Sequence, residues 1–233
     1  MTAFDEATAV RRRAEGVYDA RPDQRFAIVT AGGSTPPAVN GGALIAQVLR
    51  AVLDTSPNPH PVATTANFLR VAQLAPAEVR VDWLKQGRTA STARASLVQD
   101  GQTILDLSVT TGTVPDSGAA AVAADGRGLA DATLLNWTGP PPDFPPIEDC
   151  IDLGPWRGSV SADGAEGYAM QVSVLMDPVT SGWQRRNPSG VPEMRGYFSL
   201  RDGTVPDAYV LALALDGLPP AVFGLGATGW APT

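Results

Sequence analysis

The two residue types that serve most often in nucleophilic and metal chemistry occur once each in this chain of 233 residues. His60 is the only histidine and Cys150 the only cysteine, so a metal site of the ordinary cysteine and histidine kind has too few ligands. A Ser-His-Asp or Cys-His mechanism would have to use His60. Because Pro59 and Pro61 hold the backbone around it extended, a histidine at a strand entrance is the simpler interpretation. Cys150 has no partner for an intramolecular disulfide, and we interpret it as an inert linker thiol.

The element best able to position other chemistry is a helix predicted over residues 41–53. Its apolar side chains recur at helical spacing, at Leu44, Ile45, Val48, Leu49, Val52 and Leu53. Alanines fill most other positions, so little polar surface remains beyond Gln47 and Arg50. A helix that is apolar almost all round must be covered on several sides. We expect the strands that follow it to wrap it.

Four strand-like segments come next, at residues 62–71, 79–83, 90–99 and 102–111, with no further helix between them. Val79, Val81 and Trp83 alternate with charged residues, which is the period-two pattern of a half-buried strand. Asp100-Gly101, between the last two segments, is typical of a type I′ hairpin turn. The sequence therefore predicts an antiparallel meander around a long buried helix, the α+β arrangement called the hot-dog fold.

The second half of the chain repeats this unit. Strands are predicted at 168–176 and 195–200, and a second apolar helix at 206–217, beginning near Pro206. Repetition of one supersecondary unit predicts a double hot-dog, each repeat a long buried helix wrapped by an antiparallel sheet. Between the halves lie an Ala/Gly-rich stretch at 117–126 and a proline-rich one at 140–146, which are typical of a linker. We predict an N-terminal hot-dog at 1–113, a linker at 114–150 and a partial C-terminal hot-dog at 151–233.

The second repeat is expected to be incomplete. Four strands follow the first helix, whereas the sequence ends at Thr233, soon after the second helix. An unfinished sheet would expose a strand edge and the apolar face of the helix at 206–215. We predict that self-association into a dimer or higher oligomer covers this surface. Sedimentation as a compact, soluble monomer would contradict that expectation.

Composition narrows the possible partners and locations. The formal net charge is −7 and the sequence pI is about 4.6, which disfavours nucleic acid and anionic membranes as principal partners, although a local basic patch could still bind an anionic ligand. The first residues carry charges where a signal peptide needs an apolar core, and no apolar run of about 18 residues occurs. We therefore expect a cytoplasmic location by default.

A series of short motifs between residues 37 and 101 carries a family resemblance. The motifs are Pro37-Ala-Val-Asn-Gly-Gly42, His60-Pro61, Asn67-Phe-Leu-Arg70, Leu84-Lys-Gln-Gly-Arg88, Ser91, Arg94 and Gln99-Asp-Gly101. Each is weak alone, but their order and spacing are specific. Together they resemble the acyl-CoA thioesterases of the double hot-dog type, namely the thioesterase II group and its actinobacterial relatives.

The resemblance implies an activity and a set of site residues. Family members hydrolyse acyl-CoA to free acid and CoA without a metal or redox cofactor, so acyl-CoA is the expected partner. They hold the attacking water with an aspartate of the second helix, a Thr or Ser at the start of the next strand, and a Gln on a later strand. By motif the aspartate corresponds to Asp216 and the hydroxyl residue to Thr233. The glutamine has no counterpart in this sequence.

Physical chemistry gives reasons for these roles. A carboxylate can orient and deprotonate water, and partial burial in an apolar helix raises its pKa toward a useful range. Backbone N–H groups at a helix start, such as those of Gly41 and Gly42 after Asn40, can stabilise an oxyanion. Arg70 and Arg88 are candidates for binding the phosphates of CoA.

Each assignment also has a purely structural alternative. Asp216 could be only the polar residue that ends a helix before Gly217, and Asn40-Gly41-Gly42 only an N-cap with close packing. The two arginines could be solvated residues at strand ends. At the level of the whole protein, the alternative to an enzyme is a catalytically incomplete hot-dog protein that binds acyl-CoA or another protein. Dehydratase chemistry on a thioester is disfavoured, because it needs a histidine paired with an acid and the only histidine lies between prolines.

Overall fold

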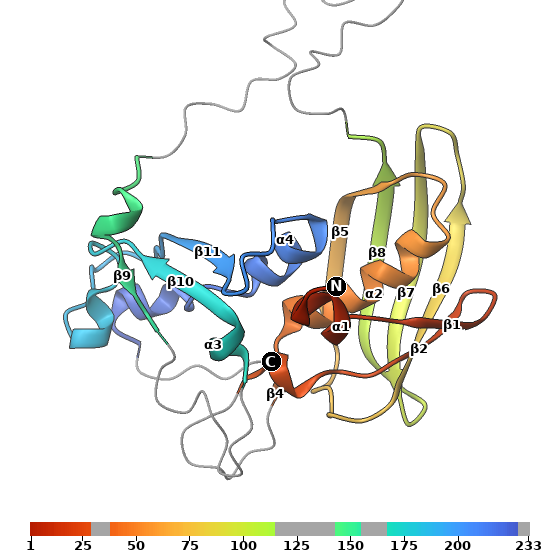
Figure 1. Cartoon of the computed structure of the whole chain (residues 1–233), viewed down its shortest axis with the longest axis horizontal. Coiled ribbons are helices and arrows are strands. Elements are labelled where there is room, and N and C mark those ends of the chain that lie inside the picture. The colour runs from red at the N-terminus through yellow and green to blue at the C-terminus, as the bar shows by residue number, and fades with distance from the viewer. Residues whose placement is uncertain (29–37, 115–142, 155–166, 228–233) are drawn as a thin grey trace, which may run out of the picture.

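The first half of the chain is a helix lying across a six-stranded antiparallel sheet (Figure 1). The computed structural model describes residues 1–28, 38–114, 143–154 and 167–227. Helix α2 (Gly41–Asp54) packs against the sheet, in which the strands follow the order β1-β2-β6-β7-β8-β5. Their bounds are β1 (Arg11–Ala14), β2 (Val17–Ala20), β5 (His60–Phe68), β6 (Ala77–Lys85), β7 (Ala90–Gln99) and β8 (Gln102–Gly112). The predicted helix and the four antiparallel strands after it are confirmed, but only β6, β7 and β8 form a meander, because β5 pairs with β8 at the edge of the sheet and not with β6.

Burial explains why this unit forms. Alternate residues of two inner strands, β7 and β8, face the helix and are almost completely buried; they are Ala93, Ala95 and Leu97 on β7 and Leu105, Leu107 and Val109 on β8. The turn between these strands has positive φ angles of 48° at Asp100 and 73° at Gly101, as the hairpin prediction requires. Gln99 pairs with Gln102 across it.

Strands β1 and β2 were not predicted. Every residue of β1 is exposed, so its sequence lacks the alternation of apolar and polar residues that marks a half-buried strand. Pairing and charge hold it instead: Arg11 and Arg13 form ion pairs with Asp19 of β2, and Arg13 also pairs with Glu78 of β6. The N-terminal segment further contains α1 (Ala3–Ala7), a 3-10 turn η1 (Gln24–Phe26), and the short pair β3 (Ala27–Ile28) and β4 (Ala38–Val39).

The second half contains a smaller sheet of order β11-β10-β9 and the helix α4. Its elements are η3 (Ile147–Asp149), β9 (Ile151–Asp152), α3 (Tyr168–Gln171), β10 (Val172–Met176), η4 (Gly182–Arg185), β11 (Gly196–Leu200), α4 (Ala208–Leu215) and η5 (Ala221–Leu225).

Two boundaries in this half differ from the sequence prediction. The strand expected at 168–176 begins with the helical turn α3, in which Tyr168 and Ala169 are buried; local periodicity did not show this turn because tertiary packing fixes it. Helix α4 begins after Pro206, because the Asp207 side chain caps it by accepting from the backbone N–H groups of Tyr209 and Val210 at 2.9 and 2.8 Å.

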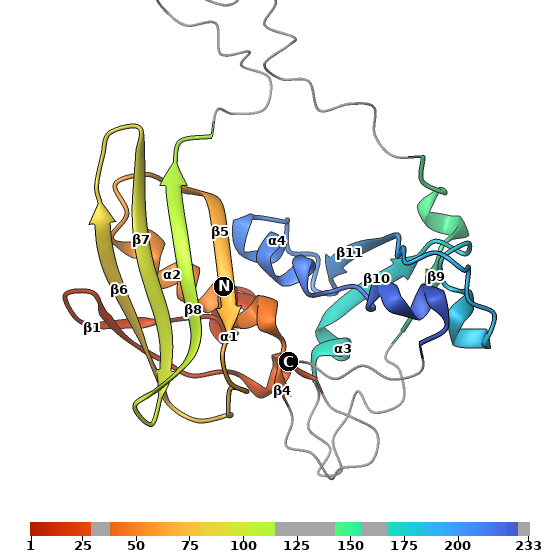
Figure 2. The ribbon, with the colours of Figure 1, turned by 180° about the vertical axis from the view of Figure 1, so that it is seen from behind.

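The two halves meet where α4 packs against α2 (Figures 1 and 2). Gly42, near the start of α2, lies against the backbone of Ala212 and Leu213 near the end of α4. Toward the other end of the pair, the Arg50 guanidinium lies 4.2 Å from the centre of the Tyr209 ring. The helices therefore run antiparallel, and the amino end of α2 lies beside the carboxyl end of α4. The protein has the double hot-dog fold that the repeat predicted.

Several expectations about the assembly and the domain limits stay predictions. In the described part of the chain, β5 is an edge strand, and Leu211 and Leu215 on α4 are 61% and 81% exposed. An exposed strand edge and exposed apolar side chains on the helix are the features from which self-association was predicted. The Ala/Gly-rich stretch and most of the predicted linker lie outside the described residues, so the limits 1–113, 114–150 and 151–233 remain a proposal.

Candidate functional site

Asp216 lies at the junction of the two central helices. It is the residue that caps the carboxyl end of α4. Its carboxylate Oδ2 accepts a hydrogen bond of 2.8 Å from the backbone N–H of Gly41, the first residue of α2. Its backbone carbonyl accepts a second hydrogen bond, of 2.9 Å, from the side-chain amide of Asn40. Three of the residues predicted from sequence, Asn40, Gly41 and Asp216, thus meet at one point.

Asn40 holds this junction together from within. Its side chain is fully buried. The amide oxygen accepts from the N–H of Ala43 at 3.1 Å and so caps α2, while the amide nitrogen donates to Asp216. The N-cap interpretation of Asn40 is therefore confirmed, and the same side chain also ties the second half of the chain to the first.

The two glycines after Asn40 leave room for this approach. A Cβ atom on Gly42 would lie 2.4 Å from the carbonyl oxygen of Ala212 and 2.7 Å from the Cα of Leu213. A Cβ on Gly41 would lie 3.0 Å from Oδ2 of Asp216 and 2.7 Å from Cζ of the Phe68 ring. Any side chain at either position would therefore separate α4 from α2 or displace the carboxylate.

Two opposing effects set the charge of Asp216. Desolvation raises the pKa of its carboxyl group, and the backbone N–H groups of Gly41 and Gly42 lower it in part. The net pKa is above the ordinary aspartate value, so desolvation outweighs the positive end of the α2 dipole. The residue as a whole is exposed, which lets water reach it. A carboxylate with a raised pKa and access to water can act as a general base.

Aromatic side chains surround the junction, and sequence analysis did not assign them a role. The ring of Phe68, at the end of β5, borders Gly41, and the ring of Phe198 borders Gly217. The hydroxyl of Tyr168 donates to the carbonyl oxygen of Gly217 at 3.4 Å, and burial raises the pKa of this phenol, with a smaller contribution from the Asp216 charge. For Phe68 a sequence signal did exist, because the residue belongs to one of the family motifs, Asn67-Phe-Leu-Arg70.

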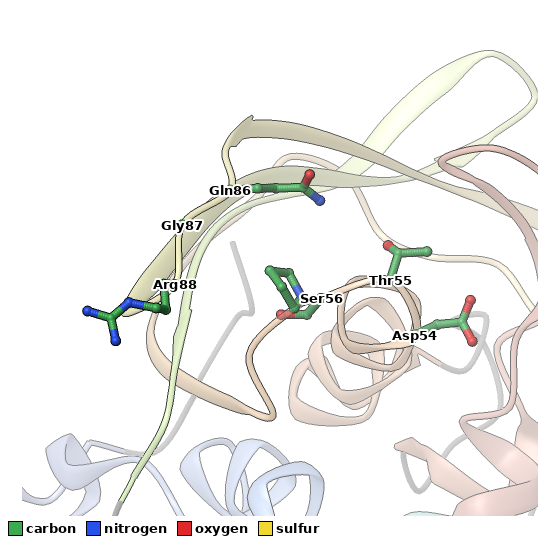
Figure 3. A pocket seen from close by; sticks show the side chains of 7 residues that line it. Asp54, Thr55, Ser56, Gln86, Gly87 and Arg88 are labelled. Atoms are coloured by element: carbon green, nitrogen blue, oxygen red, sulfur yellow. The ribbon is translucent and has the colours of Figure 1, made fainter.

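The two predicted arginines lie toward opposite ends of α2. Arg70 comes just after β5, near Phe68, and donates to the carbonyl oxygen of Thr103 at 2.8 Å. Arg88 lines an open pocket of about 460 Å³ at the carboxyl end of α2, together with Asp54, Thr55, Ser56, Pro57, Gln86 and Gly87. Its guanidinium points away from Asp54 (Figure 3). Because a helix of this length spans about 20 Å, the structure brings Arg70, but not Arg88, to the Asp216 end.

The remaining candidates do not enter this site. Thr233 lies outside the described residues, so its role stays a prediction. His60 is the first residue of β5, as expected, and its Nδ1 accepts from the N–H of Val114 at 3.1 Å. Desolvation and then the nearby carboxylates of Asp177, Asp149 and Glu148 raise the pKa of the Cys150 thiol, which disfavours the thiolate form of a nucleophile. In the part of the chain that the structure describes, no cluster of metal-binding side chains occurs and no helix is long and apolar enough to cross a membrane.

Comparison with known proteins identifies the family. A model described as the acyl-CoA thioesterase N-terminal domain matches residues 30–113, and one described as the acyl-CoA thioesterase C-terminal domain matches residues 147–233. A structure from Thermobifida fusca, assigned as a thioesterase II, is 32% identical with a TM-score of 0.78, over 100% of this chain and 77% of that one. The chain belongs to the acyl-CoA thioesterase family. No match was found among curated proteins.

More distant structures share the fold of this thioesterase family member. A hot-dog protein of unknown function from Alicyclobacillus acidocaldarius has a TM-score of 0.69 at 18% identity, over 97% of this chain and 73% of that one. An acyl-CoA thioesterase II from Mycobacterium marinum has a TM-score of 0.58 at 19% identity, over 92% of this chain and 68% of that one. Both the family resemblance and the double hot-dog architecture predicted from sequence are confirmed.

Proposed function

We propose that this chain hydrolyses acyl-CoA thioesters, with Asp216 as the general base. The observation that carries the proposal is the hydrogen bond of 2.8 Å between the Asp216 carboxylate and the N–H of Gly41, made at the helix junction by a group with a raised pKa. Family membership supports the reaction class, and this geometry supports Asp216 as the base.

The proposed reaction has two steps. The carboxylate of Asp216 removes a proton from a water molecule as the water oxygen bonds to the thioester carbonyl carbon, which gives a tetrahedral oxyanion and a protonated Asp216. The intermediate then collapses, the carbon–sulfur bond breaks, and the departing thiolate takes the proton from Asp216. The products are the free acid and CoA, and the carboxylate is restored.

The amino end of α2 serves both anionic states in this scheme. In the structure the N–H of Gly41 donates to Asp216, whereas the oxyanion site predicted from sequence would need this N–H to be free. When Asp216 takes up a proton, its oxygen becomes a weaker acceptor and negative charge moves to the substrate oxygen. The N–H groups of Gly41 and Gly42 and the helix dipole can then stabilise that charge. The total charge beside the helix end stays the same throughout.

We propose that Asn40 is a positioning residue and does not itself contact substrate. Its side chain is fully buried and is occupied by Ala43 on one side and the Asp216 carbonyl on the other. Loss of the amide would release the segment that carries the base without removing any group that meets the substrate. We also assign Arg70 rather than Arg88 to the phosphates of CoA, because Arg70 lies at the Asp216 end of α2 and a guanidinium can bind phosphate through two parallel hydrogen bonds.

The test is thiol release from a panel of acyl-CoA chain lengths by the wild-type chain and by Asp216→Asn. Asparagine keeps the size of the side chain and can still accept from Gly41, but it cannot remove a proton. We expect kcat to fall by about 100-fold or more while KM changes little. In Asn40→Ala, kcat should fall less and the pH profile of kcat should shift, because the base remains but its surroundings change.

The outcomes separate the proposal from its alternative. Turnover that is unaffected by Asp216→Asn would remove Asp216 from the mechanism. A folded wild-type chain that binds acyl-CoA but releases no thiol would favour the non-catalytic binding protein. Asp207→Asn is a matched control, because Asp207 caps the other end of α4 and should leave kcat unchanged.

A further inference from the structure

Phe68 occupies an unusual position for a large apolar residue. It is the last residue of β5 and pairs with Leu105 of β8, yet 43% of its surface is exposed. Residues of the hydrophobic core in the same sheet, such as Leu105, are completely buried. Packing within the first sheet therefore does not account for an aromatic ring at this position.

The tip of the Phe68 ring lies beside the carboxylate of Asp216, the candidate base. A Cβ atom placed on Gly41 would lie 2.7 Å from Cζ and 2.9 Å from Cε1 of Phe68, and 3.0 Å from Oδ2 of Asp216. The tip of the ring and the carboxylate thus lie within 3.0 Å of the same point. Glycine is the only residue type that leaves this point free, because it has no side chain. The Phe68 ring, the start of α2 and the Asp216 carboxylate therefore form three sides of one small space.

From this juxtaposition we infer that Phe68 is a specificity-determining residue that contacts the acyl carbons next to the thioester carbonyl. The inference rests on the proposed function. A water held by Asp216 lies about 3 Å from the carboxylate, and the carbon that it attacks must be about 3–3.5 Å from the water. The first acyl carbons therefore lie within reach of the ring tip, whereas the distant end of a long chain does not.

This position determines what the ring can discriminate. A methyl group on the carbon next to the carbonyl would compete with the ring for space, whereas added length at the far end of the acyl chain would not. Phe68 should therefore select against branching beside the carbonyl and have little influence on chain length. One methyl group in an apolar site changes kcat/KM by about tenfold or more.

The experiment compares the best straight-chain acyl-CoA of the panel with its 2-methyl analogue. In Phe68→Ala we expect the ratio of kcat/KM for the branched to the straight substrate to rise about tenfold, and in Phe68→Trp we expect it to fall. The relative kcat/KM values of straight chains of different length should stay as in wild type. Leu69→Ala is the matched control, since it removes an exposed apolar side chain from the adjoining residue, and its ratio should equal that of wild type.

The results distinguish this inference from the proposed function. If wild type hydrolyses the straight substrate and Asp216→Asn does not, but the ratio is unchanged in both Phe68 variants, the role of Phe68 is wrong while the hydrolase proposal stands. An equal rise of the ratio in Leu69→Ala would also overturn it. If wild type hydrolyses neither substrate, both the proposed function and the inference fail.

Discussion

The substitution Gly42→Ala should break the functional site through packing alone. Gly42 is where the backbones of α2 and α4 come closest. A Cβ there would lie 2.4 Å from the carbonyl oxygen of Ala212, 2.7 Å from Cα of Leu213 and 2.9 Å from its carbonyl oxygen. All three are backbone atoms of a helix, so none can rotate away. The new methyl group can be accommodated only by moving one helix relative to the other.

The size of that movement follows from the contact distances. Ordinary van der Waals contact begins near 3.4 Å, so the helices must separate by about 1 Å at this point. Overpacking of this kind costs about 1–3 kcal/mol of the free energy of unfolding. The same movement would stretch the bond of 2.8 Å between Gly41 and Asp216, and a misplacement of about 1 Å lowers kcat by about 100-fold.

Denaturant unfolding and thiol release would measure the two effects on the same preparations. Gly41→Ala is the matched comparison, because the added methyl group meets the tip of the Phe68 side chain, which can rotate, and the Asp216 carboxylate. We expect its unfolding free energy to stay within about 0.5 kcal/mol of wild type while kcat falls. The reasoning is refuted if Gly42→Ala unfolds at the wild-type denaturant concentration and hydrolyses substrate at the wild-type rate.

Three further predictions concern charged side chains. Because desolvation raises the pKa of Asp216, log kcat/KM should rise with pH and then level off, with its midpoint above the ordinary aspartate pKa. A profile that is flat from pH 4 upward would exclude Asp216 as the base. The same raised pKa means that the folded state loses stability as pH rises through the pKa of Asp216 and the group ionises. Asp216→Asn should therefore be at least as stable as wild type at neutral pH. Denaturant midpoints of both proteins at pH 3 and pH 7 would show whether their difference in stability disappears in acid. For CoA binding, Arg70→Ala should raise KM by about tenfold with kcat unchanged, whereas Arg88→Ala should leave both KM and kcat unchanged. Initial rates with one acyl-CoA would measure these values. If Arg88→Ala raises KM and Arg70→Ala does not, the phosphates lie at the other end of α2.

Short-range pattern predicted the elements that bury a regular face. Helix α2 and strands β6 to β8 have clear periodicity, and Asp100-Gly101 supplied a turn whose positive φ angles the structure confirms. Strand β1 was missed because its exposed arginines carry no burial pattern. The turn α3 was taken for strand because contacts with distant parts of the chain, not local sequence, stabilise it.

In the candidate site, too, the sequence indicated which residues take part but not how they contact one another. The motif resemblance named Asp216, Asn40, Gly41 and Gly42 from the sequence, but it did not place Asp216 against Gly41. The two residues are 175 positions apart, and neither one alone indicates which N–H will bind which carboxylate. Phe68 was overlooked for the same reason, since its role depends on what lies beside the ring.

The sequence by itself determined the family, the repeated helix-and-sheet unit and the residue types of the candidate site, because those depend on local periodicity and on motif order. Only the tertiary structure decided that the start of α2 meets the end of α4, and that Arg70 and Arg88 lie toward opposite ends of α2. It also decided that the Asn40 side chain links the two helices by hydrogen bonds to Ala43 and Asp216. The physical reason is that close packing between two helices distant in sequence depends on glycines at one point of contact, and only the folded chain shows which backbone atoms occupy the space they leave.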